Sequence, residues 1–234
     1  MHNKKDMPQM QHDFATRLLS ALSGERMEAY RDRLNDDGNG NLFSHYAWNI
    51  ALSESLYPSL QMLEIVLRNT IHRAVSEYFG QPDWYDDDSI IHVKDRAAVI
   101  KAKKTLLDKN KPLEPGRVIA ELNFGFWTTL MDSRYEQVLW TKLLKPCFPH
   151  LPRYLRTRKN VSARFQRIRR LRNRVFHHEP IWHWHDLAEQ HREILEAIAW
   201  IEPKARDFVE AIDRFPSLYR DGLVVIKSRL QRFE

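Results

Sequence analysis

Residues 161–182 read VSARFQRIRRLRNRVFHHEPIW, and this stretch carries the clearest helical pattern of the chain. Its apolar residues recur three or four positions apart and form one stripe on a helical wheel: Val161, Phe165, Ile168, Leu171 and Val175. We expect a helix over residues 160–178. It should end before Pro180, because proline disfavours helical geometry in the residue that precedes it.

The same spacing recurs along the chain and predicts an all-α protein. Apolar residues at helical spacing share one face of a second long helix, over residues 44–79: Leu56, Leu60, Leu63, Leu67 and Ile71. We expect this helix to bend near Pro58 and to end at Gly80. The other predicted helices cover residues 13–34, 94–108, 117–123, 126–145, 185–213 and 217–232, and the predicted loops cover 36–41 and 111–116.

The length and composition indicate one globular domain over residues 1–234. No run of eighteen apolar residues exists, so no membrane span is expected, and the first residues lack the apolar stretch of a secretory signal. The one cysteine, Cys147, excludes an internal disulfide, fits a reducing compartment and is expected to be buried. We therefore expect a cytoplasmic protein.

The basic residues are unevenly distributed. Residues 137–178 contain 12 Lys and Arg and no Asp or Glu, whereas the rest of the chain carries a net charge of −6. A basic segment of this kind attracts a polyanion such as RNA, because binding releases counterions from the phosphates. The alternative is a solvated basic face that pairs with acidic helices of the same fold.

Three residues near the end of the helix over 160–178 depart from the pattern of a solvated face. Arg172 projects within about 40° of the centre of the apolar stripe, where a leucine would be unremarkable. Asn173 and His177 are four positions apart, so they lie on one flank of the helix. Arginine suits a phosphate because its planar fork binds two oxygens, and histidine suits proton transfer because it titrates near neutral pH.

These residue types meet the needs of RNA cleavage by the RNA's own 2′-hydroxyl. The reaction requires a general base, a general acid and a cation that stabilises the charge on the phosphorane. We assign Arg172 and His177 as catalytic and Asn173 as a positioning residue. The exposed basic residues of the same helix would guide RNA: Arg164, Arg167, Arg170 and Arg174. Because one histidine is poorly suited to act as acid and base in one step, we expect two copies of the motif to meet in a homodimer.

Three alternative interpretations remain open at this point. The basic helix can bind nucleic acid without cutting it, or hold a neighbouring helix by ion pairs. The cluster of His177, His178, Glu179, His183 and His185 can alternatively ligate a metal ion, although Pro180 separates its two halves. We expect no metal and no cofactor, and assign His178 a local auxiliary role.

The segment LEIVLRNTIH, over residues 63–72, carries a second polar group. Glu64 and Arg68 are four positions apart, which is typical of a surface salt bridge. With Asn69 they can also form a polar patch that supports Arg172 or His177.

The sequence resembles a known family at these motifs. Arg172-Asn173-x-x-x-His177 is similar to the R-x4–6-H signature of HEPN domains, and the wider pattern resembles the Abi-like (abortive infection) family of bacterial proteins within that superfamily. The shared blocks cover roughly residues 40–205: Trp48-Asn49, LEIVLRNTIH (63–72), FGFWTTL (124–130), Leu139-Trp140, Phe148-Pro149 and LRNRVFHHEPIW (171–182).

The resemblance implies a HEPN-like helical bundle, here with additional N- and C-terminal helices. It also implies a metal-independent endoribonuclease with a composite site at a dimer interface, and a toxin-like role in phage defence. An antitoxin or a small RNA is a possible partner. Since some HEPN proteins bind RNA without cutting it, the alternative is a non-catalytic module that holds a small RNA or a partner effector.

Overall fold

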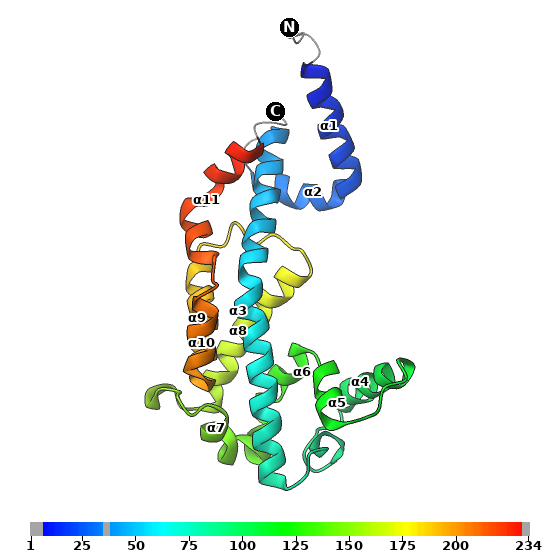
Figure 1. The fold of residues 1–234 in the computed structure, drawn as a ribbon, viewed down its shortest axis with the longest axis vertical. Helices are drawn as coiled ribbons and strands as arrows, with labels where there is room; N and C mark the ends of the chain where they lie inside the picture. The colour runs from blue at the N-terminus through cyan, green and yellow to red at the C-terminus, as the bar shows by residue number, and fades with distance from the viewer. Residues whose placement is uncertain (1–6, 35–37, 231–234) are drawn as a thin grey trace. The chain divides into compact units, whose positions relative to one another are not determined.

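The computed structural model describes residues 7–34 and 38–230, and within these ranges it contains helices and no strand (Figure 1). The all-α prediction is therefore confirmed. The α-helices are α1 (Met7–Leu22), α2 (Gly24–Arg31), α3 (Asn39–Phe79), α4 (Arg96–Asp108), α5 (Pro115–Glu121), α6 (Phe124–Thr129), α7 (Thr141–Cys147), α8 (Arg158–Phe176), α9 (Leu187–Ile201), α10 (Pro203–Glu210) and α11 (Phe215–Leu230). No helix in the described part of the chain is both long and apolar enough to cross a membrane.

The chain forms two compact units. Unit 1 comprises residues 1–57, 173–188 and 214–234, and unit 2 comprises residues 58–172 and 189–213. Helices α3 and α8 each supply residues to both units, with the divisions after Tyr57 and after Arg172. The single domain expected over residues 1–234 stays a prediction.

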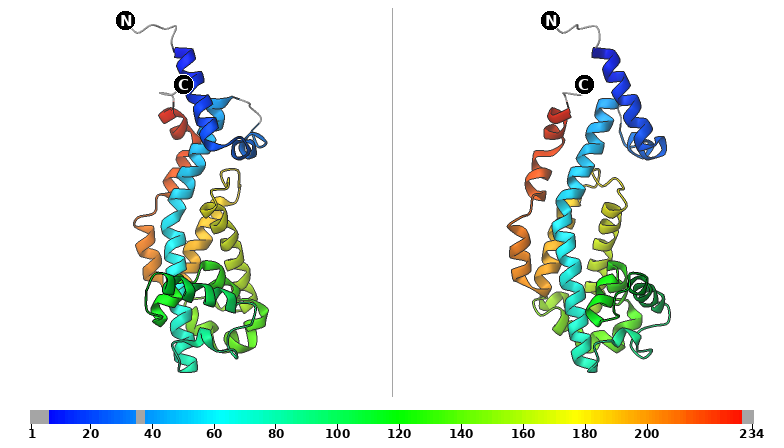
Figure 2. Two further views of the ribbon diagram at one scale, coloured as in Figure 1. Left: turned by 90° about the vertical axis from the view of Figure 1, so that its right-hand side faces the viewer. Right: turned by 45° about the vertical axis from the view of Figure 1, so that its right-hand side comes forward.

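The core of unit 2 is built from the stripes that the sequence predicts. Leu60, Leu63, Leu67 and Ile71 of α3 are at most 3% exposed. From α8, Val161, Phe165, Ile168 and Leu171 are equally buried, and the rings of Phe148 and Phe165 lie 5.7 Å apart. Burying each such side chain stabilises the fold by about 1.5–3 kcal/mol. Within this unit α4 and α5 lie side by side (Figures 1 and 2).

The core of unit 1 is smaller. Met27 and Tyr30 of α2 and Leu42 of α3 are each 1% exposed, and partly buried side chains surround them, including Tyr46 and Trp182. The rings of Tyr30 and Tyr46 meet edge to face at 5.2 Å. This cluster explains why α3 begins earlier than predicted: the added first turn brings Leu42 into the core.

The N-terminal prediction is wrong in one respect. Residues 13–34 form two helices rather than one, because Ser23 takes a φ of 65° and its hydroxyl accepts a hydrogen bond from the Arg26 N–H at 3.4 Å. A serine hydroxyl in this position caps a new helix. In the predicted loop over 36–41, residues 36 and 37 lie outside the described residues, and residues 39–41 are helical.

The predicted helix over residues 126–145 is also wrong. This part of the chain contains α6, the 3-10 turn η2 (Ser133–Tyr135), the π-helical turn η3 (Glu136–Trp140) and α7. The Trp140 indole N–H donates to the Leu130 carbonyl at 2.6 Å. That bond satisfies a buried carbonyl where the α-helix stops, so the chain tolerates the break.

Proline and glycine explain the remaining differences. The expected helix over 185–213 breaks at Glu202 because Pro203 begins α10, where its missing N–H is harmless. Within α11, Gly222 interrupts the helical geometry with a φ of 66° and a ψ of −161°. As predicted, Gly80 follows the end of α3, with a left-handed φ of 71°.

Candidate functional site

Helix α8 ends at Phe176, two residues earlier than predicted. The His177 N–H still donates to the Asn173 carbonyl at 2.9 Å, but His178 has a φ of 58°. The His178 N–H then donates to the Val175 carbonyl at 3.2 Å and the Glu179 N–H to the Arg174 carbonyl at 2.9 Å. This pair of bonds is a Schellman cap. Consequently His177 and His178 stand exposed at the carbonyl end of the helix, where a cation is favoured.

The turn that follows α8 is anchored by a buried side chain, that of Asn49 on α3. Its amide oxygen accepts from the N–H groups of Ile181 at 2.7 Å and Trp182 at 3.3 Å, and its NH2 group donates to the Glu179 carbonyl at 3.4 Å. Arg26 adds a bond to the His178 carbonyl at 3.0 Å. Asn49 was not among the predicted site residues.

Arg174, predicted to contact RNA, is engaged locally within unit 1. Its guanidinium lies 2.9 Å from the Glu179 carboxylate and 5.5 Å from the centre of the Trp184 ring. Its side chain is nevertheless 39% exposed. Arg174 therefore links the Schellman turn to the segment that follows it by contacting a residue in each.

In unit 2, Arg172 lies beside Glu64. The Arg172 Nη2 atom is 3.4 Å from a Glu64 carboxylate oxygen, and both side chains are about a quarter exposed, at 23% and 24%. Glu64 is thus a neighbour of Arg172, and the Arg68 side chain contacts Asn69 at 3.4 Å. Part of the predicted polar patch is present. Arg172 therefore lies on the margin of the core and is part-exposed.

Two of the four arginines expected to be solvated are not. Arg164 contacts Glu196 at 2.7 Å and stacks 4.8 Å from the centre of the Trp200 ring. Arg167 contacts Glu193 at 2.6 Å. Their side chains are only 17% and 28% exposed, because α9 presents acidic residues to this part of α8. At these two positions the basic face of α8 pairs with an acidic helix, as the alternative interpretation expected. Arg170, in contrast, is exposed.

Burial is the largest influence on the pKa of the Glu193 carboxyl. It raises this pKa, and the cations of Arg164 and Arg167 oppose that shift. The two arginines therefore compensate the charge of a carboxylate that is only 12% exposed.

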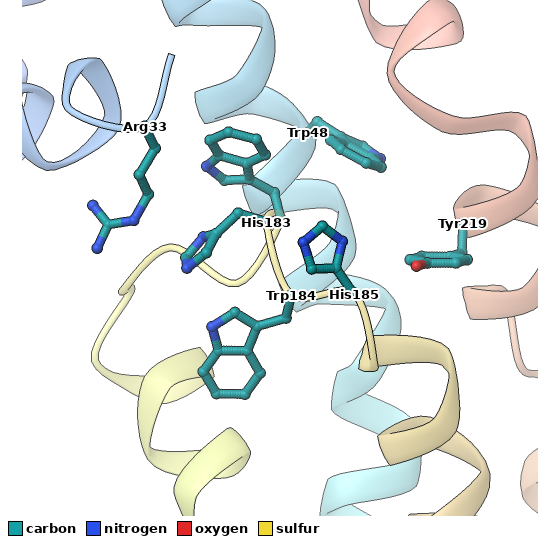
Figure 3. A pocket seen from close by; sticks show the side chains of 7 residues that line it. Arg33, Trp48, His183, Trp184, His185 and Tyr219 are labelled. Carbon is teal, nitrogen blue, oxygen red and sulfur yellow. The ribbon is translucent and has the colours of Figure 1, made fainter. Parts of the chain in front are cut away.

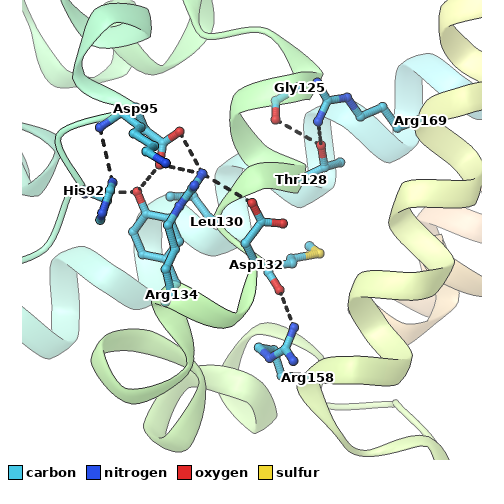
Figure 4. Close-up of polar contacts among 12 residues, drawn as sticks. His92, Asp95, Gly125, Thr128, Leu130, Asp132, Arg134, Arg158 and Arg169 are labelled. Carbon is cyan, nitrogen blue, oxygen red and sulfur yellow. Dashed lines mark hydrogen bonds and ion pairs between the residues drawn. The ribbon is translucent and has the colours of Figure 1, made fainter.

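Helix α8 also carries an arginine that sequence reasoning passed over. Arg169 contacts the Thr128 hydroxyl at 3.4 Å, and its guanidinium lies close to Gly125 of α6 (Figure 4). A Cβ atom at position 125 would lie 3.2 Å from the Arg169 Nη2 atom. The glycine in FGFWTT thus admits a guanidinium between two helices of unit 2.

A separate polar network in unit 2 is structural. The Tyr135 hydroxyl donates to Asp95 at 2.6 Å and accepts from the His92 N–H at 3.1 Å, and Arg134 contacts the same Asp95 carboxylate at 3.0 Å (Figure 4). Burial raises the pKa of Tyr135 above its ordinary value. The phenol therefore stays a neutral donor that fixes the start of α4. Elsewhere in unit 2, Cys147 is buried as expected, and burial raises the pKa of its thiol to about 12.

Unit 1 contains a pocket of about 510 Å³ next to the turn that follows α8 (Figure 3). Its lining includes His183 and His185, two of the residues considered above for a metal site. Burial lowers the pKa of His183, and the neighbouring charges of Arg33, Arg174 and His185 lower it further. Among the residues that the structure describes, no three His, Cys, Asp or Glu side chains are grouped to hold a metal ion.

Comparisons with known proteins found no family model, no curated protein and no solved structure that matches this chain.

Proposed function

We propose that the protein is a metal-independent endoribonuclease of HEPN type. His177 acts as general acid or base, Arg172 contacts the scissile phosphate, and Asn173 orients His177 or the phosphate. The observation that carries the proposal is the exposure of His177 on the capped end of α8, five positions after an arginine that is itself part-exposed beside Glu64.

The chemistry follows from these groups. A base removes the proton of the ribose 2′-hydroxyl, whose oxygen attacks the adjacent phosphorus, and an acid protonates the leaving 5′-oxygen. A bond forms between the 2′-oxygen and phosphorus, the bond between phosphorus and the 5′-oxygen breaks, and no metal-bound water is needed. The products are a 2′,3′-cyclic phosphate and a free 5′-hydroxyl. A guanidinium stabilises the negative charge that accumulates on the phosphorane oxygens.

Acid and base roles in the same step require a second histidine. We propose that a second copy of the chain supplies it across a two-fold axis. An exposed apolar group in unit 1 supports this: Tyr57 and Phe176 are 47% and 37% exposed, with their rings 5.8 Å apart. Ile50 lies seven residues before Tyr57 on α3, on the same face, and is 54% exposed. Such a face is better covered by a partner than left in water.

The wider role is proposed from the resemblance alone. As an Abi-like effector, the protein would act in the cytoplasm, halt the infected cell, and be restrained by an antitoxin or a small RNA. Of the four arginines proposed to guide RNA, Arg170 is the best placed, because Arg164 and Arg167 neutralise carboxylates of α9.

The test compares wild type with His177→Ala on a 5′-labelled RNA in the presence of EDTA. We expect wild type to leave 2′,3′-cyclic phosphate ends and the variant to bind the RNA without cutting it. His150→Ala is a matched control, because this exposed histidine lies in unit 2 and its N–H bonds to the Trp200 carbonyl through the backbone. Loss of cleavage in EDTA would refute the mechanism. Binding without cleavage by all three proteins would favour the non-catalytic RNA-binding module.

A further inference from the structure

The pocket in unit 1 has walls that are almost entirely aromatic. Trp48 comes from α3, Trp182 and Trp184 from the segment after α8, and Tyr219 from α11 (Figure 3). Its volume of about 510 Å³ lies within the range of small-molecule sites. Flat π-faces of this kind bind other flat rings, and nucleobases stack on them regardless of sequence.

Two of the three tryptophan rings that line the pocket are held in place by their neighbours. The His45 ring lies 4.5 Å from Trp182, and the Arg174 guanidinium lies 5.5 Å from the centre of Trp184. Because neighbours already fix these rings, a ligand loses little by ordering them.

Three ring nitrogens of the lining side chains are buried without a hydrogen-bond partner among the described residues. They are the indole nitrogens of Trp48 and Trp182 and the Nδ1 atom of His183. Buried polar atoms are mostly paired in folded proteins, and a rotation of these side chains toward the pocket would let a ligand supply the partner that each nitrogen lacks. Indole N–H groups only donate, so the partner must offer acceptors, as the ring nitrogens and carbonyl oxygens of a nucleobase do.

The charges at the pocket are positive. Arg33 and His185 line it and are exposed, and Arg33 also donates to the Ala29 carbonyl. Two arginines, Arg33 and Arg174, are among the neighbours whose charge lowers the pKa of His183. A cationic rim beside stacking faces selects a ligand that is both flat and anionic.

We propose that this pocket binds a nucleotide, with the base against the tryptophan rings and the phosphate beside Arg33 and His185. The nucleotide is either a free mononucleotide or one residue of an RNA strand. The inference goes beyond the proposed nuclease function and does not depend on it, since neither Arg172 nor His177 lines the pocket.

The experiment measures quenching of tryptophan fluorescence, with isothermal titration calorimetry as a second readout. The ligands are AMP, adenosine, ribose 5-phosphate and a hexamer of adenylate with 2′-O-methyl groups, which the proposed nuclease reaction cannot cut. AMP should saturate the signal, and adenosine and ribose 5-phosphate should each bind at least about tenfold more weakly. Tighter binding of the hexamer identifies RNA as the source, and tighter binding of AMP identifies a free nucleotide.

Substitutions distinguish nucleotide binding in the pocket from the proposed nuclease activity. Arg33→Ala should weaken AMP binding to the level of adenosine and leave adenosine binding unchanged, and Arg33→Lys should restore part of the loss. Arg192→Ala, at an exposed position on α9 in unit 2, is the control and should bind as wild type does. His177→Ala should also bind AMP normally. The proposal is overturned if neither AMP nor the hexamer saturates, or if Arg33→Ala and Arg192→Ala bind AMP equally well.

Discussion

The Glu64 carboxylate of α3 lies 3.4 Å from the Arg172 guanidinium of α8. Their contact joins residues 108 positions apart in the sequence within unit 2. Helical spacing had suggested Arg68 as the partner of Glu64. The carboxylate thus holds the one arginine that the proposed reaction requires.

This contact predicts how substitutions at the two positions combine. Arg172→Ala should abolish cleavage, by about 100-fold or more, because it removes the cation at the phosphorane. Glu64→Gln alone should lower the free energy of unfolding by about 1 kcal/mol or less. In the Arg172→Ala background the same change should be neutral or stabilising, since it removes a half-buried carboxylate that has lost this cation. Urea denaturation of the four proteins gives the coupling, and additive effects would contradict the contact.

The cap of α8 predicts a gain in stability at His178. This residue has a φ of 58°, which costs a non-glycine residue roughly 1 kcal/mol. His178→Gly should therefore raise the free energy of unfolding by about 0.5–1 kcal/mol. The Arg26 contact should survive, because it is made to the backbone carbonyl. His177→Gly is the control: its φ is not positive, so it should bring no gain. A loss of stability in His178→Gly would speak against the Schellman cap.

A substitution at Asn49 should lower the free energy of unfolding, unlike the one at His178. Asn49→Ala removes three hydrogen bonds and leaves the buried Ile181 N–H without its acceptor, so it should cost about 1–3 kcal/mol. Because the same turn presents His177, cleavage should fall as well. Asn160→Ala is a matched change with a smaller expected cost, since that side chain donates one bond of 3.4 Å. Thermal unfolding measures both, and equal costs would mean that Asn49 does not anchor the turn.

The buried environment of His72 predicts that the stability of the protein depends on pH. Its Nδ1 atom accepts from the Trp84 indole N–H at 3.1 Å, and burial lowers the pKa of the imidazole below its ordinary value of 6.5. Below pH 6.5 the unfolded chain takes up a proton that folded His72 resists, so stability is lost as the pH falls. Urea midpoints at pH 7.5 and 5 should show a smaller loss for His72→Asn than for wild type. An unchanged loss would assign the effect to other groups.

Local patterns in the sequence predicted most of the helices and their buried faces. The stripe from Val161 to Val175 and the one from Leu56 to Ile71 are buried as the spacing indicates. Helical spacing indicates which face of a helix is apolar, and Pro180 and Gly80 indicate where the two helices end. The break at Ser23 was missed because a serine inside an apolar repeat costs little in a helix, and only its φ and its bond to Arg26 reveal the cap.

The sequence by itself determined that this protein is all-helical and that His177 stands at the end of a basic helix, because helical spacing and the following proline are local properties of the chain. Only the tertiary structure decided the partners of the charged residues. Glu64 meets Arg172, Arg164 and Arg167 meet the carboxylates of α9, and Asn49 anchors a turn more than 130 positions away. Such contacts depend on which helices pack against each other, and helical spacing contains no information about that choice.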